Sequence, residues 1–322
     1  MTADGKNDGR AAIRFPQRLR KPALLLIVPT LAVLLMIVLL QRYLIYFPKK
    51  EPVILPEDAG LPAGRVKAIS TETADGHALN GWLVGAEPGQ RDATSKGTQQ
   101  AGGETRLLLY FSGNAANRLY RVEEATTLNE LGADVAIFDY RGYGENTGSP
   151  SEEGLAADAR AMWRHALEEC DVSSCRQIIL VGESLGGGVA TRLAAELCEA
   201  GTPPGGLVLR STFSSLVDAG AYHYPWLPVR LFLRDRFASL ERIPSVTCPI
   251  LVLHGRQDRI VPFELGQRLF EAAPQMSHNG LAKQFVEFPG ADHNDVLWIA
   301  RNAYREAVGT FLDELGSARL EE

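Results

Sequence analysis

The 322-residue sequence is poor in the residues that bind metals and form disulfides. It contains four cysteines and six histidines. None of them forms a paired C-x-x-C or an H-E-x-x-H pattern, so the spacing typical of zinc ligands is missing and we expect no metal site. Cys170 and Cys175 flank a short turn and are either a disulfide or two free thiols. Cys198 and Cys248 are expected in the core or at a helix end.

The sequence also lacks the features of nucleotide and nucleic-acid binding. Gly142 and Gly144 follow an expected strand, but Thr147 stands where a dinucleotide fingerprint needs its third glycine. The formal net charge is −6, and the chain beyond residue 50 is more acidic still, because residues 1–50 carry nine Lys or Arg and only two Asp or Glu. An acidic body is unlike the basic surface that binds nucleic acid. We therefore expect neither a nucleotide cofactor nor a nucleic-acid partner.

Long hydrophobic runs are absent except for one, at residues 23–40, where Thr30 is the only polar residue. As a helix this run spans about 27 Å, close to the hydrocarbon thickness of a bilayer. We expect residues 23–41 to be a transmembrane signal anchor, followed by a linker at 42–64. Basic residues are more numerous before the run than after it, which places residues 1–22 in the cytoplasm and the body in the periplasm or outside the cell. The alternative is a cleaved signal peptide, but the run is long for one and QRYLIYFP is a poor cleavage site.

From residue 65 onward, expected strands alternate with expected helices. The strands are at 66–70, 78–85, 106–111, 133–139, 178–181, 206–210, 249–254 and 284–288. This alternation predicts an α/β domain over 65–322 with a mostly parallel, doubly wound sheet. Residues 211–247 form an insertion between two strands, and Ser149 is expected to cap the helix that follows the fourth strand. One long helix is expected to close the chain.

The body is organised around the stretch QIILVGESLGGGVA at 177–190. It is typical of a buried strand, a sharp turn and a helix, with Ser184 at the apex. Glycines two residues before and two after the serine leave room for the neighbouring backbone, and the amide of Leu185 can face an oxyanion. A glycine-rich turn without chemistry is the alternative. The pattern of strand and helix on either side favours a nucleophile elbow.

A serine nucleophile of this kind needs an acid and a histidine, in that order, later in the chain. His293 follows the last expected strand, and Asp258 follows the strand before it. The carboxyl ends of these strands lie on the same edge of the sheet as Ser184. We therefore predict that Asp258 orients His293 and that His293 removes the serine proton. Asp292 and Asp295 are weaker candidates for the acid.

A second oxyanion donor is expected in SGNAAN at 112–117, directly after a buried strand. The amide of Asn114 or Ala115 is the candidate. The alternative is a plain Gly-Asn turn.

Together these motifs resemble the α/β-hydrolase superfamily, and the resemblance extends from about residue 65 to the end. It rests on YFSGNAAN, FDYRGYGENTGSPSEEG, VGESLGGGVA, LHGRQDRIVP and GADHND. The sequence looks most like the compact, membrane-anchored branch that includes protein depalmitoylases and their bacterial relatives. The resemblance implies an α/β-hydrolase fold with a short cap insertion, the triad Ser184, Asp258 and His293, and no cofactor. Relatives usually have His before Gly113, where this chain has Ser112.

The expected function is a membrane-anchored serine hydrolase that cleaves carboxylic esters or thioesters through an acyl-enzyme. An aminopeptidase or amidase with the same triad and a non-catalytic binding module are the alternatives. Tyr222, Tyr224 and Trp226 in the insertion are candidate substrate-binding residues. They suit an acyl slot or the bilayer interface, or form a small core of the cap.

Overall fold

The computed structural model describes residues 17–86, 106–169 and 178–318. Cys170 and Cys175, the expected disulfide partners, lie outside the described residues. The chain divides into two compact units, Met1–Arg42 and Tyr43–Glu322. The first unit is dominated by helix α1 (Gln17–Ile45), which is long and apolar enough over Val28–Ile45 to cross a membrane.

An eight-stranded sheet organises the second unit, in the order β10-β9-β8-β7-β4-β6-β3-β2. Strand β3 is antiparallel to both β2 and β6, and the other pairs of this sheet are parallel, so the predicted mostly parallel sheet is confirmed. The strands are β2 (Val66–Glu72), β3 (Ala78–Val84), β4 (Leu107–Phe111), β6 (Asp134–Phe138), β7 (Ile178–Glu183), β8 (Gly206–Arg210), β9 (Ile250–Gly255) and β10 (Gln284–Phe288).

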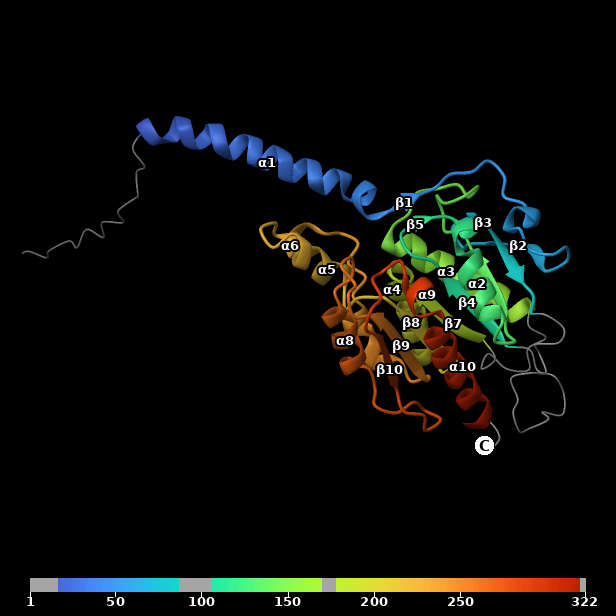
Figure 1. Ribbon diagram of the computed structural model, residues 1–322. Helices are drawn as coiled ribbons and strands as arrows, with labels where there is room; N and C mark the ends of the chain where they lie inside the picture. Colours follow the sequence, from blue (N-terminus) through green and yellow to red (C-terminus); the bar gives the residue numbers. More distant parts are fainter. Residues whose placement is uncertain (1–16, 87–105, 170–177, 319–322) are drawn as a thin grey trace, which may run out of the picture. The chain divides into compact units, whose positions relative to one another are not determined.

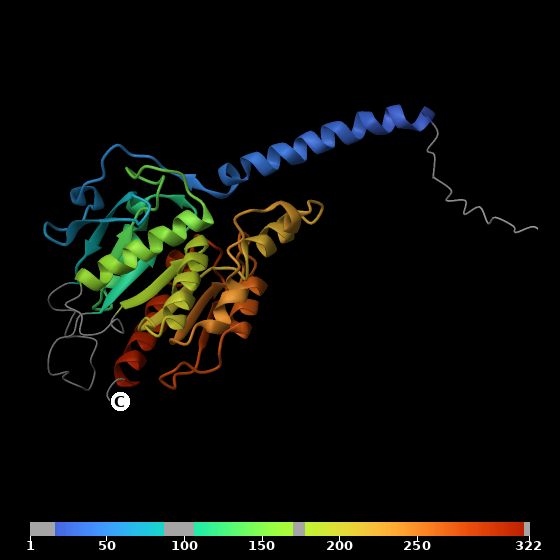
Figure 2. The same ribbon diagram turned by 180° about the vertical axis from the view of Figure 1, so that it is seen from behind.

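Helices cover both faces of this sheet (Figures 1 and 2). One face packs against α3 (Glu152–Glu169), α4 (Leu185–Glu199) and α8 (Phe263–Ala272). The other packs against α2 (Val122–Asn129), α9 (Val296–Ile299) and α10 (Arg301–Ala318). In β4, Leu109 contributes to the first core and Leu108 to the second. A central strand buried on both faces explains why the sequence there is continuously apolar.

Two helix boundaries differ from the prediction. The hydroxyl of Ser151, not that of Ser149, accepts from the amide of Gly154, so α3 begins two residues later than predicted. The expected final helix is two helices, because the backbone leaves helical geometry at Ala300 between α9 and α10.

The segment expected as a linker, 42–64, contains two short elements within the second unit. Strand β1 (Phe47–Pro48) pairs with β5 (Ala115–Ala116), and a 3-10 turn, η1, covers Pro56–Ala59. Tyr46 and Ile54 are buried.

The expected insertion lies between β8 and β9 and has two parts. Helices α5 (Leu216–His223) and α6 (Val229–Phe232) form the first. The second contains α7 (Ser239–Arg242) and the 3-10 turn η4 (Ile243–Ser245), and it buries Phe237 and Ile243 in the core. The carboxylate of Glu152 at the start of α3 accepts from the amides of Arg236 and Phe237, which fixes the returning chain.

Candidate active site

Ser184 lies in the sharp turn between β7 and α4. Its φ is +51° and its ψ −117°, a strained conformation for a residue with a side chain. The glycines around it permit close packing. A Cβ at Gly186 would lie 2.0 Å from the carbonyl oxygen of Phe111, and one at Gly182 would lie 2.6 Å from the Cα of Gly187. The turn thus has the geometry of a nucleophile elbow.

The structure brings the three predicted residues together at the carboxyl edge of the sheet. His293 Nε2 lies 3.0 Å from Ser184 Oγ, and His293 Nδ1 lies 2.7 Å from Asp258 Oδ2. All three residues are buried: Ser184 is 8%, His293 6% and Asp258 7% exposed. This arrangement can move a proton from the serine hydroxyl to the imidazole while the carboxylate holds the ring.

Asp258 has several other partners. Its Oδ1 accepts from the amides of Ile260 and Val261, at 2.9 and 2.7 Å. His254 Nε2 lies 3.4 Å from Oδ2. Burial opposes ionisation of Asp258, but the bonds from His254, His293 and the Val261 amide outweigh it and hold the pKa of this carboxyl well below its usual range. The acid is therefore a fixed carboxylate.

Asp292 and Asp295 have other partners. Asp292 accepts from the amides of Arg259 and His293 and pairs with the guanidinium of Arg259. Asp295 accepts from the amide of Asp292. In the described part of the chain, neither carboxylate bonds to the imidazole of His293.

Of the expected oxyanion donors, Leu185 lies in the elbow itself, and Asn114 and Ala115 follow the neighbouring strand β4. Leu185 is the first residue of α4, and Asn114 follows the carboxyl end of β4. Among the described residues, neither backbone amide donates to another group. Ala115 lies in β5 and pairs with Phe47, whereas the amide of Gly113 donates to Glu183 Oε2 at 3.3 Å.

A buried charged cluster beneath the elbow was not predicted from the sequence. Glu183 Oε2 pairs with Arg121 Nε at 2.6 Å, and Glu183 Oε1 with Arg210 Nη2 at 3.2 Å. Arg210 also pairs with Glu124 at 2.7 Å, and the hydroxyl of Tyr110 lies within hydrogen-bond distance of both carboxylates, 2.7 Å from Glu124 and 3.0 Å from Glu183. The only signal in the sequence was a charged residue, Glu183, at the end of an apolar strand.

The three aromatic candidates of the insertion lie on its surface. Tyr222 is 63%, Tyr224 53% and Trp226 74% exposed. The rings of Tyr224 and Trp226 meet edge to face at 6.4 Å. These exposures do not fit a small core of the cap.

Sequence comparisons identify the family of the chain. The profile of a family described as "alpha/beta hydrolase fold" matches residues 106–247. An uncharacterized protein of Mycobacterium tuberculosis is 43% identical over 274 residues, which cover 85% of this chain and 88% of that protein. Lysophosphatidylserine lipase ABHD12 of Danio rerio is 38% identical over 198 residues, 56% of this chain and 51% of the lipase. The chain thus matches about half the length of that lipase.

Solved esterases share the fold at lower sequence identity. The Pyrococcus furiosus esterase Pf2001 superposes with a TM-score of 0.60 at 21% identity, covering 83% of this chain and 98% of the esterase. Est1E of Butyrivibrio proteoclasticus, solved with ferulic acid bound, has a TM-score of 0.58 at 19% identity, covering 77% and 99%. The chain belongs to the α/β-hydrolase superfamily and is a hydrolase with lipase and esterase relatives.

Proposed function

We propose that the protein is a membrane-anchored serine hydrolase that cleaves carboxylic esters or thioesters through an acyl-enzyme. The observation that carries this proposal is the continuous chain from Ser184 Oγ through the imidazole of His293 to Asp258 Oδ2, at 3.0 and 2.7 Å. An elbow that presents the serine, with a helix N-terminus behind it, supports the same role.

In this mechanism His293 Nε2 takes the proton of Ser184 Oγ as the oxygen attacks the substrate carbonyl carbon. The amides of Leu185 and Asn114 donate to the oxyanion of the tetrahedral intermediate. His293 then gives its proton to the leaving oxygen or sulfur, and the acyl-enzyme remains. Water, activated by the same imidazole, releases the acid and restores the serine. Asp258 keeps the imidazole in the required tautomer and stabilises its charged form.

The proposed substrates are acyl esters, with thioesters as a second bond class. Lipase and esterase relatives support the ester. The resemblance of the sequence to protein depalmitoylases adds the thioester. Ala115 would contribute to the oxyanion loop through its place in β5 rather than as the primary donor, because Asn114 lies nearer the end of β4.

The proposed anchor is helix α1, with residues 1–22 in the cytoplasm and the catalytic domain outside it. The helix is apolar over Val28–Ile45, long enough to cross a bilayer. More basic residues precede the apolar run than follow it, which supports this orientation.

A fluorophosphonate probe, followed by substrate profiling of the full chain, tests the function. We expect the probe to label the wild type on Ser184 and to leave Ser184→Ala unlabelled. Matched p-nitrophenyl ester, thioester and anilide substrates then identify the bond that is cleaved. Absence of labelling would favour a binding module, and preference for the anilide would favour an amidase.

A further inference from the structure

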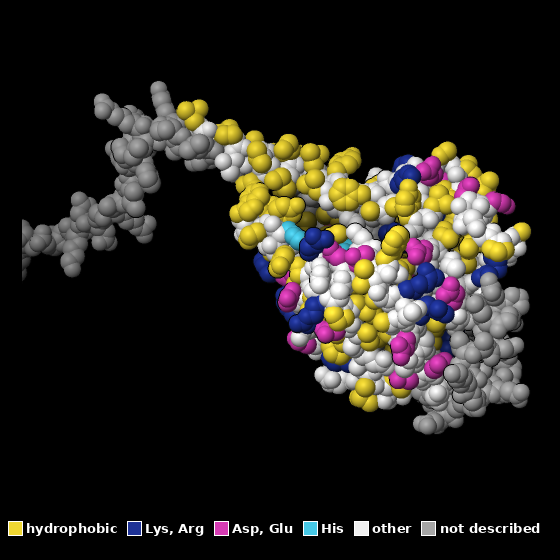
Figure 3. Space-filling model, in the orientation of Figure 1, with side chains coloured by type: hydrophobic (Ala, Val, Ile, Leu, Met, Phe, Trp, Pro, Cys, Tyr) yellow, Lys and Arg dark blue, Asp and Glu magenta, His cyan; other side chains and the backbone are white. Residues whose placement is uncertain are grey.

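The first part of the insertion carries a large exposed apolar surface, which we call the cap patch. It consists of Tyr222, Tyr224, Trp226, Leu231 and Phe232, which are 63%, 53%, 74%, 79% and 39% exposed. Hydrophobic side chains gather over α5 and α6 in the space-filling view (Figure 3). A cluster of this kind on a monomer's surface marks an interaction site, and tyrosine and tryptophan are the residues that prefer a membrane interface.

The exposed charges of the cap-patch segment are basic, and one of them, Arg230, is paired at 2.9 Å with the partly buried Asp218 of α5. Within residues 222–237 the exposed charged side chains are Arg230, Arg234 and Arg236. The one acidic residue of that stretch, Asp235, is 4% exposed. These three arginines form a basic rim, although the chain as a whole has a net charge of −6. An apolar, aromatic surface edged by arginine is complementary to a bilayer with anionic headgroups.

The insertion that carries the cap patch is also bonded to the residues that directly follow α1. The hydroxyl of Tyr46 donates to Asp235 Oδ2 at 3.0 Å, directly after the last helical residue, Ile45. The side-chain amide of Asn114, in the oxyanion loop, donates to the carbonyl of Ile45 at 2.7 Å. Within the second unit, Ile45 and Tyr46 therefore contact both the loop that carries Asn114 and the insertion.

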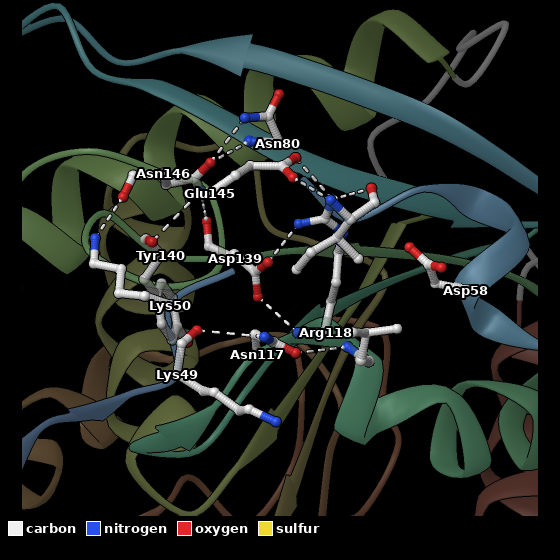
Figure 4. A network of polar contacts seen from close by, with 12 residues as sticks. Lys49, Lys50, Asp58, Asn80, Asn117, Arg118, Asp139, Tyr140, Glu145 and Asn146 are labelled. Atoms are coloured by element: carbon white, nitrogen blue, oxygen red, sulfur yellow. Dashed lines mark hydrogen bonds and ion pairs between the residues drawn. The ribbon is translucent and has the colours of Figure 1, made fainter. Parts of the chain in front are cut away.

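The chain after this point is held firmly to the catalytic domain. The side-chain amide of Asn117 donates to the Lys49 carbonyl, and Lys50 Nζ donates to the carbonyl of Asn146, in the polar network of Figure 4. Arg118, at the centre of that network, donates to the carbonyl of Ile54 at 2.9 Å. These bonds fix the chain from Lys49 to Ile54 on the surface of the catalytic domain.

We propose that the cap patch binds the surface of the bilayer that α1 crosses, with its aromatic side chains at the interface and its arginines on anionic headgroups. This inference rests on the proposed membrane span. Its consequence is that the active-site edge faces lipid, so that the enzyme receives its acyl substrate from the membrane rather than from water.

Fluorescence quenching of Trp226 in the full chain tests this proposal. The chain has four tryptophans; Trp82 and Trp163 are 1% and 6% exposed, whereas Trp298 is 81% exposed. The reporter chain carries Trp298→Phe. The reference chain carries both Trp298→Phe and Trp226→Phe, so the fluorescence of the reporter minus that of the reference is the emission of Trp226. Each nanodisc holds one protein molecule. The lipid is either phosphatidylcholine or an equal mixture of phosphatidylcholine and phosphatidylglycerol, and each composition is prepared with and without bromine on the acyl chains.

The matched control places a tryptophan on the opposite edge of the sheet. Met276 is 54% exposed and precedes β10, whose amino end lies away from the active site. Met276→Trp in the reference chain should be quenched by aqueous acrylamide and not by brominated lipid. Labelling by the fluorophosphonate probe shows that each variant retains its folded catalytic site.

We expect brominated lipid to quench Trp226 by more than about twofold, with acrylamide access reduced relative to detergent, and more strongly with phosphatidylglycerol at low salt than at high salt. Trp226 that stays open to acrylamide and insensitive to bromine would overturn the proposal. Shielding from acrylamide without bromine quenching would also overturn it and would indicate a protein partner, such as a second copy. If alkaline carbonate removes the chain from liposomes, the span itself is wrong, a failure distinct from a resident chain whose Trp226 does not meet lipid.

Discussion

At the scale of single residues, Asp258 shows how the site fixes its own protonation. One carboxylate oxygen receives two backbone amides, and the other faces two imidazoles, those of His293 and His254. Such a carboxylate stays ionised and cannot rotate freely. His293 is therefore held with its Nδ1 proton toward Asp258 and its Nε2 lone pair toward Ser184.

We predict that Asp258→Asn lowers kcat by about 10³- to 10⁴-fold with little change in fold, because the amide NH₂ would favour the wrong imidazole tautomer. Ester hydrolysis by the purified full chain measures the effect. Glu287→Gln is the matched control, since this carboxylate lies on the surface and pairs with an exposed arginine, Arg256. Equal kcat values for the two variants would show that Asp258 does not orient the base.

The carboxylate of Glu183 balances the positive charges of the two arginines buried beside it. Glu183→Gln would leave Arg121 and Arg210 with too little negative charge around them. We predict a loss of about 3–5 kcal/mol in the free energy of unfolding at pH 7, measured by urea denaturation in detergent. Glu153→Gln, whose side chain is 78% exposed in its pair with Arg192, should change that free energy by less than about 1 kcal/mol.

The same variant has a defined pH dependence. Burial favours neutral Glu183, but Arg121, Arg210 and Tyr110 outweigh burial and lower its pKa well below the usual value. Because the folded pKa is below the unfolded one, the carboxylate stabilises the fold above about pH 4–5, and this contribution is lost as the pH falls through the folded pKa. The gap between wild type and variant should therefore narrow in acid. A gap that widens in acid would contradict this assignment.

At the scale of elements, the elbow depends on contact between the start of α4 and the end of β4. We predict that Gly186→Ala prevents formation of an active site, because its Cβ would lie 2.0 Å from the Phe111 carbonyl oxygen. Probe labelling and the melting temperature measure the loss. Gly309→Ala, in the helix α10, is the control: its nearest neighbour is a Leu131 methyl at 3.6 Å, so alanine should be neutral or stabilise by up to about 1 kcal/mol. Normal labelling of Gly186→Ala would contradict the packing described here.

The strands and the elbow were predictable because their signals are local. An apolar run such as 178–181 can only be buried, and a serine between spaced glycines after it restricts the backbone to one kind of turn. The order of acid and histidine then followed from the topology of the sheet. Ser184, Asp258 and His293 lie close together because each follows the carboxyl end of a parallel strand, and these ends meet at one edge of the sheet.

Other features were not predictable because they depend on contacts between distant segments. The apolar spacing of the last helix continues through Ala300, so nothing in the pattern marks the break there. Pro150 and Glu152 favour Ser149 as the cap on sequence alone, whereas the structure uses Ser151. The cluster of Glu183, Arg121 and Arg210 joins three elements, and its partners are identified only when the sheet and helix are assembled.

At the scale of the whole molecule, we propose an acidic hydrolase that helix α1 anchors in a membrane, with the catalytic domain on the outer side. A reporter fused after the C-terminus, of the kind that is active only after export, should be active in cells. The physical reason is the excess of basic residues before the apolar run, which favours retention of the N-terminus in the cytoplasm. A reporter that functions only in the cytoplasm would reverse the topology without affecting the catalytic assignment.

The central claim, an acyl-enzyme on Ser184, is tested most directly by the turnover of Ser184→Ala. Alanine fits the elbow, so the fold should persist with an unchanged melting temperature, while the nucleophile is lost. We predict that kcat for an activated acyl ester, measured on the full chain, falls by about 10⁴-fold or more. Turnover within about tenfold of wild type in a folded variant would contradict the claim.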